Sequence, residues 1–422
     1  MTAGDLLWPG LHRAGDLFTD AAVVAAMVRV EAAWLETLTA AGLAPQGSAK
    51  AVAAVQVSRE ALDDLRVSAE SGGNPVIPLL ALIRVEVDGP VHLSLTSQDV
   101  VDTALLLCAR DCLDAVDAEL GLQLVAGAKL AEDHRHTLMT ARTLGQAAVP
   151  TTFGARVAGW LRGLMTARDG VQRVRADLPA QVGGAGGTLA ATVEVCRAAG
   201  AAEPVAAAEG LVRDFAGRLG LRAAEPWHTT RAPVTRVADA LVEVCDALGK
   251  VANDVAQQSR PELSELREPA AEGRGGSSAM PQKRNPVLSV LIRRQAMSAP
   301  LMAAQLHLAA GAAVDERPDG AWHTEWAPLR DLSQRTVAAT RQATELLEGL
   351  EVDATAMRRH VDDALTGLLA ERAATLQKCG VEPPVDTDPA AYLGLAEQLV
   401  DRAVAAERAE ARGSDFDQAG AP

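Results

Sequence analysis

The sequence predicts an all-α protein, and three observations support this class. Aromatic residues make up only 3% of the 422 residues, whereas hydrophobic residues make up 48%. Strands are rich in aromatic and β-branched residues, while alanine, which is abundant here, is the strongest helix former. A heptad pattern of apolar residues also runs through residues 234–255. The chain is long enough for a large core and more than one domain.

The heptad pattern predicts a long helix packed against other long helices, because its apolar positions are spaced alternately by three and four. They are Val234, Val237, Leu241, Val244, Leu248, Val251 and Val255. A second helix is predicted from Thr96, since Thr96 and Asp99 have capping-box spacing. Its apolar positions are Val101, Leu105, Cys108 and Cys112. A third helix should follow Pro286; it is apolar on nearly all sides and is expected at the centre of a bundle.

We expect three domains along the chain. Residues 1–93 form an N-terminal helical domain, residues 94–342 a central long-helix bundle, and residues 343–422 a C-terminal helical domain whose tail frays from about Glu407. Two glycine-rich segments interrupt the central domain. They are Gln181–Ala190 and the loop 272–286.

Charge and composition exclude several classes of function. The formal net charge is −15 and the pI about 5.1, which argues against nucleic-acid and anionic-membrane partners but not against a small anionic substrate. The N-terminus lacks a secretory pattern, and the longest uncharged stretch, Ala296–Val314, is interpreted as a core helix. A cytoplasmic protein is expected. Five scattered cysteines indicate buried thiols, and neither a metal nor an organic cofactor is expected.

The strongest chemical signal is the segment Gly276–Pro286, GSSAMPQKRNP. Its glycine makes the backbone flexible, Ser277 and Ser278 offer hydroxyls, and Lys283 and Asn285 offer donors. Taken alone, the segment could be a glycine/serine linker that carries a lysine.

The full string resembles the signature of the fumarase/aspartase superfamily. All eight fixed positions match: Gly276, Ser277, Ser278, Met280, Pro281, Lys283, Asn285 and Pro286. Residues 92–99, HLSLTSQD, resemble the first family region, and residues 142–154 the second, in the same order along nearly the whole chain. The resemblance implies a homotetramer with a helical-bundle core, no cofactor, and active sites shared between subunits that bind a small polycarboxylate.

The resemblance also implies a chemistry. The family removes a proton next to a carboxylate, which gives an aci-carboxylate, and expels a leaving group from the β-carbon; fixed positive charge stabilises that intermediate. Ser277 is implied as the catalytic base, with Ser278 as the alternative. Substrate contacts are expected from His92, Thr96, Ser97, Gln98, Arg142, Thr143, Gln146, Thr151, Thr152, Arg231, Met280, Lys283 and Asn285. His92 could instead cap a helix, and the two threonines could be an ordinary helix start.

Departures from the family pattern narrow the reaction. Leu144 stands where fumarase-like and adenylosuccinate-lyase-like members carry a histidine. A histidine at this position can act as a general acid, which is needed when the leaving group must be protonated. A carboxylate, with a pKa of about 4, leaves without a proton and needs no such acid. Ser94 stands where glycine is expected, which could alter the floor of the pocket.

The chain resembles the bacterial 3-carboxy-cis,cis-muconate cycloisomerases of the β-ketoadipate pathway of aromatic catabolism. The matches include residues 73–78, 183–188, 226–231, 321–326 and 388–394. Their lactonisation is, in reverse, a β-elimination of a carboxylate. Nitrite also leaves without an acid, so a nitrosuccinate-lyase-like enzyme is the alternative. A classical fumarase or adenylosuccinate lyase and a non-enzymatic structural role fit less well.

Overall fold

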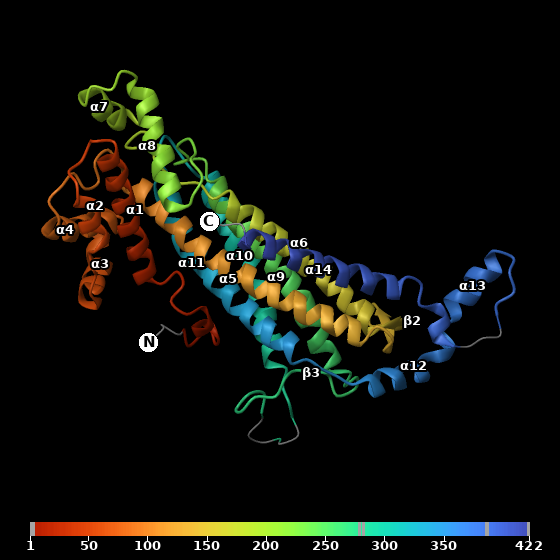
Figure 1. The fold of residues 1–422 in the computed structure, drawn as a ribbon. Helices are drawn as coiled ribbons and strands as arrows, with labels where there is room; N and C mark the ends of the chain where they lie inside the picture. The colour runs from red at the N-terminus through yellow and green to blue at the C-terminus, as the bar shows by residue number, and fades with distance from the viewer. Residues whose placement is uncertain (1–4, 277–279, 281–282, 385–387, 420–422) are drawn as a thin grey trace. The chain divides into compact units, whose positions relative to one another are not determined.

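The computed structural model describes residues 5–276, 280, 283–384 and 388–419, with side chains up to residue 409. It confirms the all-α class, since the strands are few and short (Figure 1). The helices are η1 (Leu11–Ala14), α1 (Asp20–Ala40), α2 (Ser48–Ala53), α3 (Arg59–Gly72), α4 (Val76–Glu86), α5 (Ser97–Asp133), α6 (Phe153–Ala176), α7 (Ala190–Ala198), α8 (Pro204–Leu219), α9 (Ala232–Gln258), α10 (Val287–Gly311), α11 (Gly320–Glu348), α12 (Ala354–Leu368), α13 (Ala370–Lys378), η2 (Pro389–Tyr392) and α14 (Ala396–Ala419).

The chain divides into two compact units, each assembled from three segments. Unit 1 comprises residues 1–116, 170–242 and 298–338, and unit 2 comprises residues 117–169, 243–297 and 339–422. The five longest bundle helices, α5, α6, α9, α10 and α11, contribute residues to both. The division into three consecutive domains stays a prediction.

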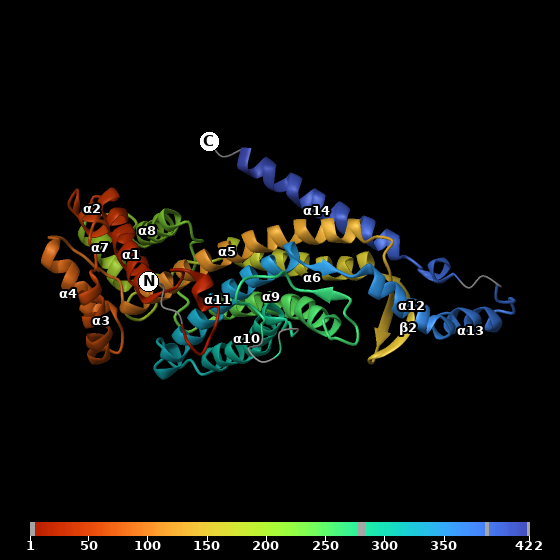
Figure 2. The same ribbon diagram turned by 90° about the horizontal axis from the view of Figure 1, so that it is seen from below.

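In unit 1, α1 packs against α2 and α8, and α7 packs against α8; both ribbon views show these helices side by side (Figures 1 and 2). Thr19 caps α1 by accepting the Ala22 N–H at 3.2 Å. The core between α1 and α8 holds Trp34, which meets Phe215 edge to face at 5.5 Å between ring centroids.

Unit 2 contains two small antiparallel sheets that the sequence analysis did not foresee. Strands β1 (Leu138–Thr143) and β2 (Gln146–Thr152) form a hairpin against which α12 packs. Its two-residue turn, Leu144 and Gly145, has φ of 51° and 80°, the positive values that a tight hairpin turn requires. Strands β3 (Leu266–Arg267) and β4 (Glu351–Val352) form the other sheet.

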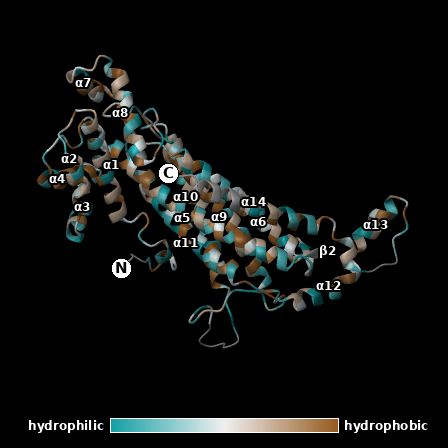
Figure 3. Cartoon of the chain, in the orientation of Figure 1, coloured by the Kyte–Doolittle hydropathy of each residue, from teal (hydrophilic) through white to brown (hydrophobic). Residues whose placement is uncertain are grey.

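Two predicted helices are confirmed. All seven heptad residues lie in α9 and are buried, and the four apolar positions after Thr96 are buried in α5. Hydrophobic and hydrophilic residues are interspersed along these helices, as amphipathic packing requires (Figure 3). No helix in the described part of the chain is long and apolar enough to cross a membrane.

Three expectations need correction. The third helix, α10, begins at Val287 as predicted, but Val290, Met297, Leu301 and Leu308 are exposed, so it is not enclosed within one chain. Helix α14 continues to Ala419, so fraying does not begin at Glu407. Cys379 is exposed, whereas the other four cysteines are buried.

Candidate active site

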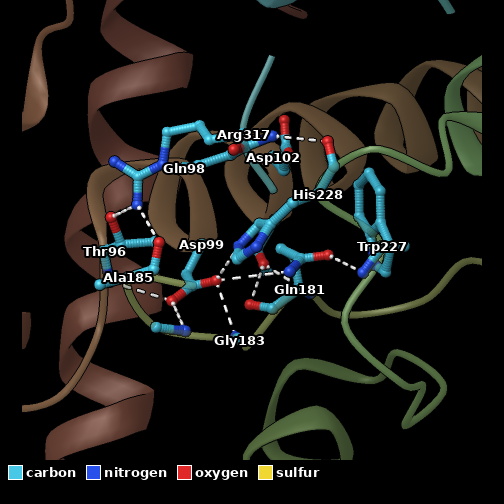
Figure 4. Close-up of polar contacts among 12 residues, drawn as sticks. Thr96, Gln98, Asp99, Asp102, Gln181, Gly183, Ala185, Trp227, His228 and Arg317 are labelled. Atoms are coloured by element: carbon cyan, nitrogen blue, oxygen red, sulfur yellow. Dashed lines mark hydrogen bonds and ion pairs between the residues drawn. The ribbon is translucent and has the colours of Figure 1, made fainter. Parts of the chain in front are cut away.

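The first matched segment lies at the amino-terminal end of α5, where Asp99 is the centre of a buried hydrogen-bond network. Its carboxylate accepts the Thr96 backbone N–H at 2.9 Å, which is half of the expected capping box. It also accepts the backbone N–H groups of Gly183 and Gly184 at 2.9 and 3.0 Å, and lies 2.7 Å from His228 Nε2 (Figure 4). Asp99 thereby joins the first segment to the glycine-rich segment.

The glycines of that segment are required by close packing. A Cβ on Gly183 would lie 2.6 Å from Cε1 of His228, closer than real Cβ contacts allow. Gly184 has φ of +68°, and its Cβ would lie 3.2 Å from the Ser94 carbonyl oxygen. The glycine-rich segment is therefore a fixed wall beside the first matched segment.

An exposed arginine beside this segment was missed by the sequence analysis. Arg317, in the link between α10 and α11, donates to the Thr96 hydroxyl and, at 3.4 Å, to the Ala185 carbonyl (Figure 4). Ser97, the first residue of α5, is only partly buried. A guanidinium next to a helix N-terminus offers charge and donors to an anion such as a carboxylate. The only sequence signal for Arg317 was a basic residue in a short interhelical link.

Residues 92–94 reach this site with an unusual backbone. His92 and Ser94 have φ of 67° and 63°, in the left-handed region that favours glycine. Ser94 accepts a hydrogen bond from the Thr192 hydroxyl at 3.0 Å, which holds the residue found in place of the family's glycine. His92 Nδ1 lies 2.6 Å from the buried Glu31 carboxylate, and the imidazole remains only partly buried.

Gln98 does not match its expected role in substrate contact. Its side chain is fully buried, and its amide donates to the His228 carbonyl at 2.9 Å. Because Gln98 is buried against residues 226–231, it cannot contact a substrate. We therefore correct the prediction: Gln98 holds that segment in position.

Arg231 needs the same correction. Its guanidinium is buried and forms bidentate contacts with both Asp102, at 2.7 and 2.9 Å, and Glu325, at 2.6 to 3.1 Å. Trp322 also donates to Asp102 at 2.9 Å. Burial lowers the pKa of Arg231, but the two carboxylates outweigh it and raise that pKa overall. Its donors are occupied, so it locks α5, α9 and α11 together within unit 1.

In unit 2 the second matched segment is the β1–β2 hairpin. Thr143 and Gln146 flank the tip and are exposed, and Thr151 is partly buried. Thr152 is buried, and its hydroxyl accepts the Ala155 N–H at 3.1 Å. We therefore correct Thr152 from a substrate contact to the cap of α6. Leu144, at the tip, is fully exposed.

Arg142 holds another buried carboxylate. It donates from both terminal nitrogens to Glu265 at 2.8 and 2.6 Å, and His360 Nδ1 lies 2.8 Å from the same carboxylate. Burial alone would raise the pKa of Glu265, but the bonds from Arg142 and His360 hold it below its usual range. Arg142 therefore joins the hairpin to Glu265, just before β3, and through Glu265 to His360 of α12, and its expected contact with substrate stays a prediction.

The signature loop is anchored at both ends. Glu268 accepts the backbone N–H groups of Leu288 and Ser289 at 2.9 and 2.7 Å, which caps α10. Asn285 donates to the Gly275 carbonyl from its backbone at 2.9 Å and from its side chain at 3.1 Å. Asn285 thus closes the neck of the loop, and because its side chain is only partly buried its expected contact with substrate stays a prediction.

Between these anchors the loop presents Lys283 and Met280, both exposed. Ser277 and Ser278 lie outside the described residues, so the catalytic assignments stay predictions. Thr96 is buried, and its hydroxyl accepts from Arg317. The residues that remain at least partly accessible for a substrate are, in unit 1, His92, Ser97 and Arg317, and, in unit 2, Arg142, Thr143, Gln146, Thr151, Met280, Lys283 and Asn285. Each unit thus presents a cation and hydroxyl groups of the kind that suit contact with an anionic group.

Comparison with known proteins gives the family. A family model described as lyase matches residues 19–300. The chain therefore belongs to this lyase family, the fumarase/aspartase superfamily.

Two relatives and one solved structure are similar over most of the chain. The nitrosuccinate lyase of Streptomyces davaonensis is 41% identical over 372 residues, which cover 85% of this chain and 76% of that protein. The 3-carboxy-cis,cis-muconate cycloisomerase of Pseudomonas putida is 36% identical over 403 residues, covering 93% and 91%. The crystal structure of the 3-carboxy-cis,cis-muconate lactonizing enzyme from Pseudomonas putida has a TM-score of 0.80 at 33% identity, covering 94% and 96% of the two chains.

Proposed function

We propose that this lyase-family enzyme is a 3-carboxy-cis,cis-muconate cycloisomerase. The observation that carries the proposal is the complete signature segment Gly276–Pro286 in a chain that matches the Pseudomonas putida lactonizing enzyme along nearly its full length. The proposed product is the carboxymuconolactone, and no cofactor takes part.

The proposed reaction adds a carboxylate oxygen of the substrate to the carbon β to a second carboxylate. The electrons of the carbon–carbon double bond move into that second carboxylate and give the aci-carboxylate. The Ser277 hydroxyl, or that of Ser278, then delivers a proton to the α-carbon and is reprotonated from water. One C–O and one C–H bond form, one π bond is lost, and no oxidant or reductant is needed.

The described residues have the charges that this path requires. Lys283 is an exposed cation in the signature loop, and Arg317 is a second exposed cation, beside Thr96 at the start of α5. Fixed cations stabilise the doubly charged aci-carboxylate more than the ground state, which is the basis of their catalytic effect. Leu144 at the tip of the hairpin supplies no proton, which suits a carboxylate that leaves unprotonated in the reverse direction.

The 41% identity to the Streptomyces davaonensis enzyme supports a second candidate, a nitrosuccinate lyase. Nitrite, like a carboxylate, leaves without a general acid, so Leu144 suits both reactions.

A direct comparison of the two substrates tests the proposal. Purified enzyme is mixed with 3-carboxy-cis,cis-muconate, and the loss of ultraviolet absorbance of the conjugated diene is followed; a parallel assay measures nitrite released from nitrosuccinate. We expect kcat/KM to be higher for the muconate. Faster release of nitrite would replace the first candidate by the second, and failure to turn over either substrate would reject both.

We also propose that the enzyme works as a cytoplasmic homotetramer whose subunits share active sites. Val290, Met297, Leu301 and Leu308 are 51% to 75% exposed in the single chain. Their spacing of seven, four and seven residues places them on one side of α10, as in helices that pack against a second helix. Leaving such a stripe in water is unfavourable, so it supports contact with another copy.

Placing a charge in this stripe should break the assembly. Leu301→Lys is expected to shift the tetramer to smaller species and to lower activity, because burying an unpaired ammonium in an apolar contact is unfavourable. Light scattering measures the mass. Val67→Lys is the matched control, since Val67 on α3 is 75% exposed and Leu301 is 73% exposed. A Leu301→Lys tetramer of unchanged mass would contradict the proposed interface.

A further inference from the structure

A groove of about 1240 Å³ lies within unit 2, between the first turns of α6, the last turns of α9 and the turn that follows. Five basic and two acidic side chains line it. The basic ones are Arg142, Arg156, Arg162, Lys250 and Arg260, and the acidic ones are Asp254 and Glu262. This excess of positive charge is notable in a chain of net charge −15, because such a chain repels anions elsewhere.

The two acidic side chains can offset only part of the charge of the five basic ones. Asp254 accepts the Trp160 indole N–H at 2.7 Å and the Lys250 ammonium at 2.5 Å. Glu265, which lies outside the groove lining, is the partner of Arg142. Lys250 and Arg142 therefore each have a carboxylate partner. Arg156, Arg162 and Arg260 remain.

Arg156 is the most informative of the three. It is partly buried, and its guanidinium has neither a hydrogen bond nor an ion pair among the described residues. Burial lowers its pKa. Arg162, nearby on α6, and Arg260, after α9, are exposed and likewise unpaired within the described part of the chain. The carboxylates of Asp254 and Glu265 act on Arg156 but offset its burial only in part, and each is engaged by another cation. An anion in the groove would supply the missing counter-charge.

We propose that this groove binds a small, multiply charged anion of the carboxylate or phosphate class, separately from the substrate. The three guanidinium groups match the forked, bidentate geometry that carboxylates and phosphates accept. The negative field of the rest of the chain restricts the ligand to small molecules, because a long polyanion would extend beyond the groove into repulsive surface. This site is independent of which reaction the enzyme catalyses.

Calorimetric titration with citrate and with inorganic phosphate tests the site. Wild-type enzyme should bind at least one of them, with an affinity that falls as sodium chloride is raised. Arg156→Gln and Arg162→Gln should each weaken binding by roughly 10- to 100-fold, the effect of losing a charge-assisted hydrogen bond. Arg162 is exposed, so its variant remains informative if Arg156→Gln fails to fold. Arg408→Gln, which removes an equal charge from an exposed arginine paired with Glu132 outside the groove, should bind as wild type does.

Activity and mass distinguish the proposal from its competitors. In the Arg162→Gln variant we expect KM and kcat for the turned-over substrate to stay unchanged and the tetramer to persist. A rise in KM that parallels the loss of citrate binding would make the groove part of the substrate site. Dissociation of the assembly would make it a contact between subunits, and absence of any binding to wild type would leave no ligand site; each result overturns the proposal.

Discussion

Arg231→Met is expected to lower the free energy of unfolding by about 3 to 5 kcal/mol, the usual cost of removing one partner from a buried ion pair. The reason is that Asp102 and Glu325 would remain buried without their counter-charge. Burial already raises the pKa of Glu325 with Arg231 present. Urea-induced unfolding of the two proteins at neutral pH measures the difference. Arg236→Met, which removes an exposed arginine paired with Asp177, is the control and should change stability by less than about 1 kcal/mol.

The deficit of Arg231→Met should shrink as the pH falls. Burial raises the folded-state pKa of Glu325 and Arg231 lowers it, so without the guanidinium that pKa rises further above its unfolded value. The folded variant then binds more protons than the unfolded chain near that pKa, so its stability decreases with rising pH and recovers as Glu325 protonates. Adding Asp102→Asn and Glu325→Gln should restore most of the loss at pH 7. An Arg231→Met enzyme of wild-type stability but raised KM would instead reinstate Arg231 as a substrate contact.

The sequence predicted those parts of the fold that depend on local periodicity. The heptad residues of α9 and the apolar positions of α5 are buried because a repeat of 3.5 residues places them on one side of a helix. The β1–β2 hairpin was missed because its turn, Leu144–Gly145, lacks the usual asparagine or aspartate before glycine. The apolar sequence of α10 predicted burial, but one side of this helix is exposed in the single chain.

The sequence identified the segments that form the candidate site, but it did not identify the individual contacts that their side chains make. Residues named for substrate contact, such as Gln98 and Arg231, are engaged by partners about 94 to 130 positions away in sequence, and spacing along the chain carries no information about such pairs. Arg317 was missed for the same reason, since its neighbour Thr96 lies 221 positions away. The signature loop was recognisable because its chemistry lies in one continuous segment.

Ser277→Ala should reduce kcat by about 10²- to 10⁴-fold, the usual contribution of a positioned proton-transfer group, with little change in KM. The hydroxyl acts on the α-carbon in the transition state and contributes little to binding the ground state. Lys283→Ala should raise KM and lower kcat together, because its exposed charge attracts a carboxylate in both states. Steady-state kinetics on the muconate separates the two patterns, and light scattering checks that both variants keep the wild-type mass.

Ser278→Ala serves as the matched control for Ser277→Ala, since it removes the same atom one residue further along the signature loop. It should retain most of the activity. An inactive Ser278→Ala with an active Ser277→Ala would move the proton-transfer role by one residue, and activity in both variants and in the double variant would place that role outside the loop.

Proton delivery to the α-carbon is tested most directly by following the reaction in D₂O by NMR. Wild-type enzyme should convert 3-carboxy-cis,cis-muconate to a lactone that carries one deuterium, on the carbon α to the carboxylate and on one face only, at a rate that Ser277→Ala abolishes. A lactone without deuterium at that carbon, or one labelled equally on both faces at the same rate in Ser277→Ala, would contradict enzymatic protonation of an aci-carboxylate by the signature loop.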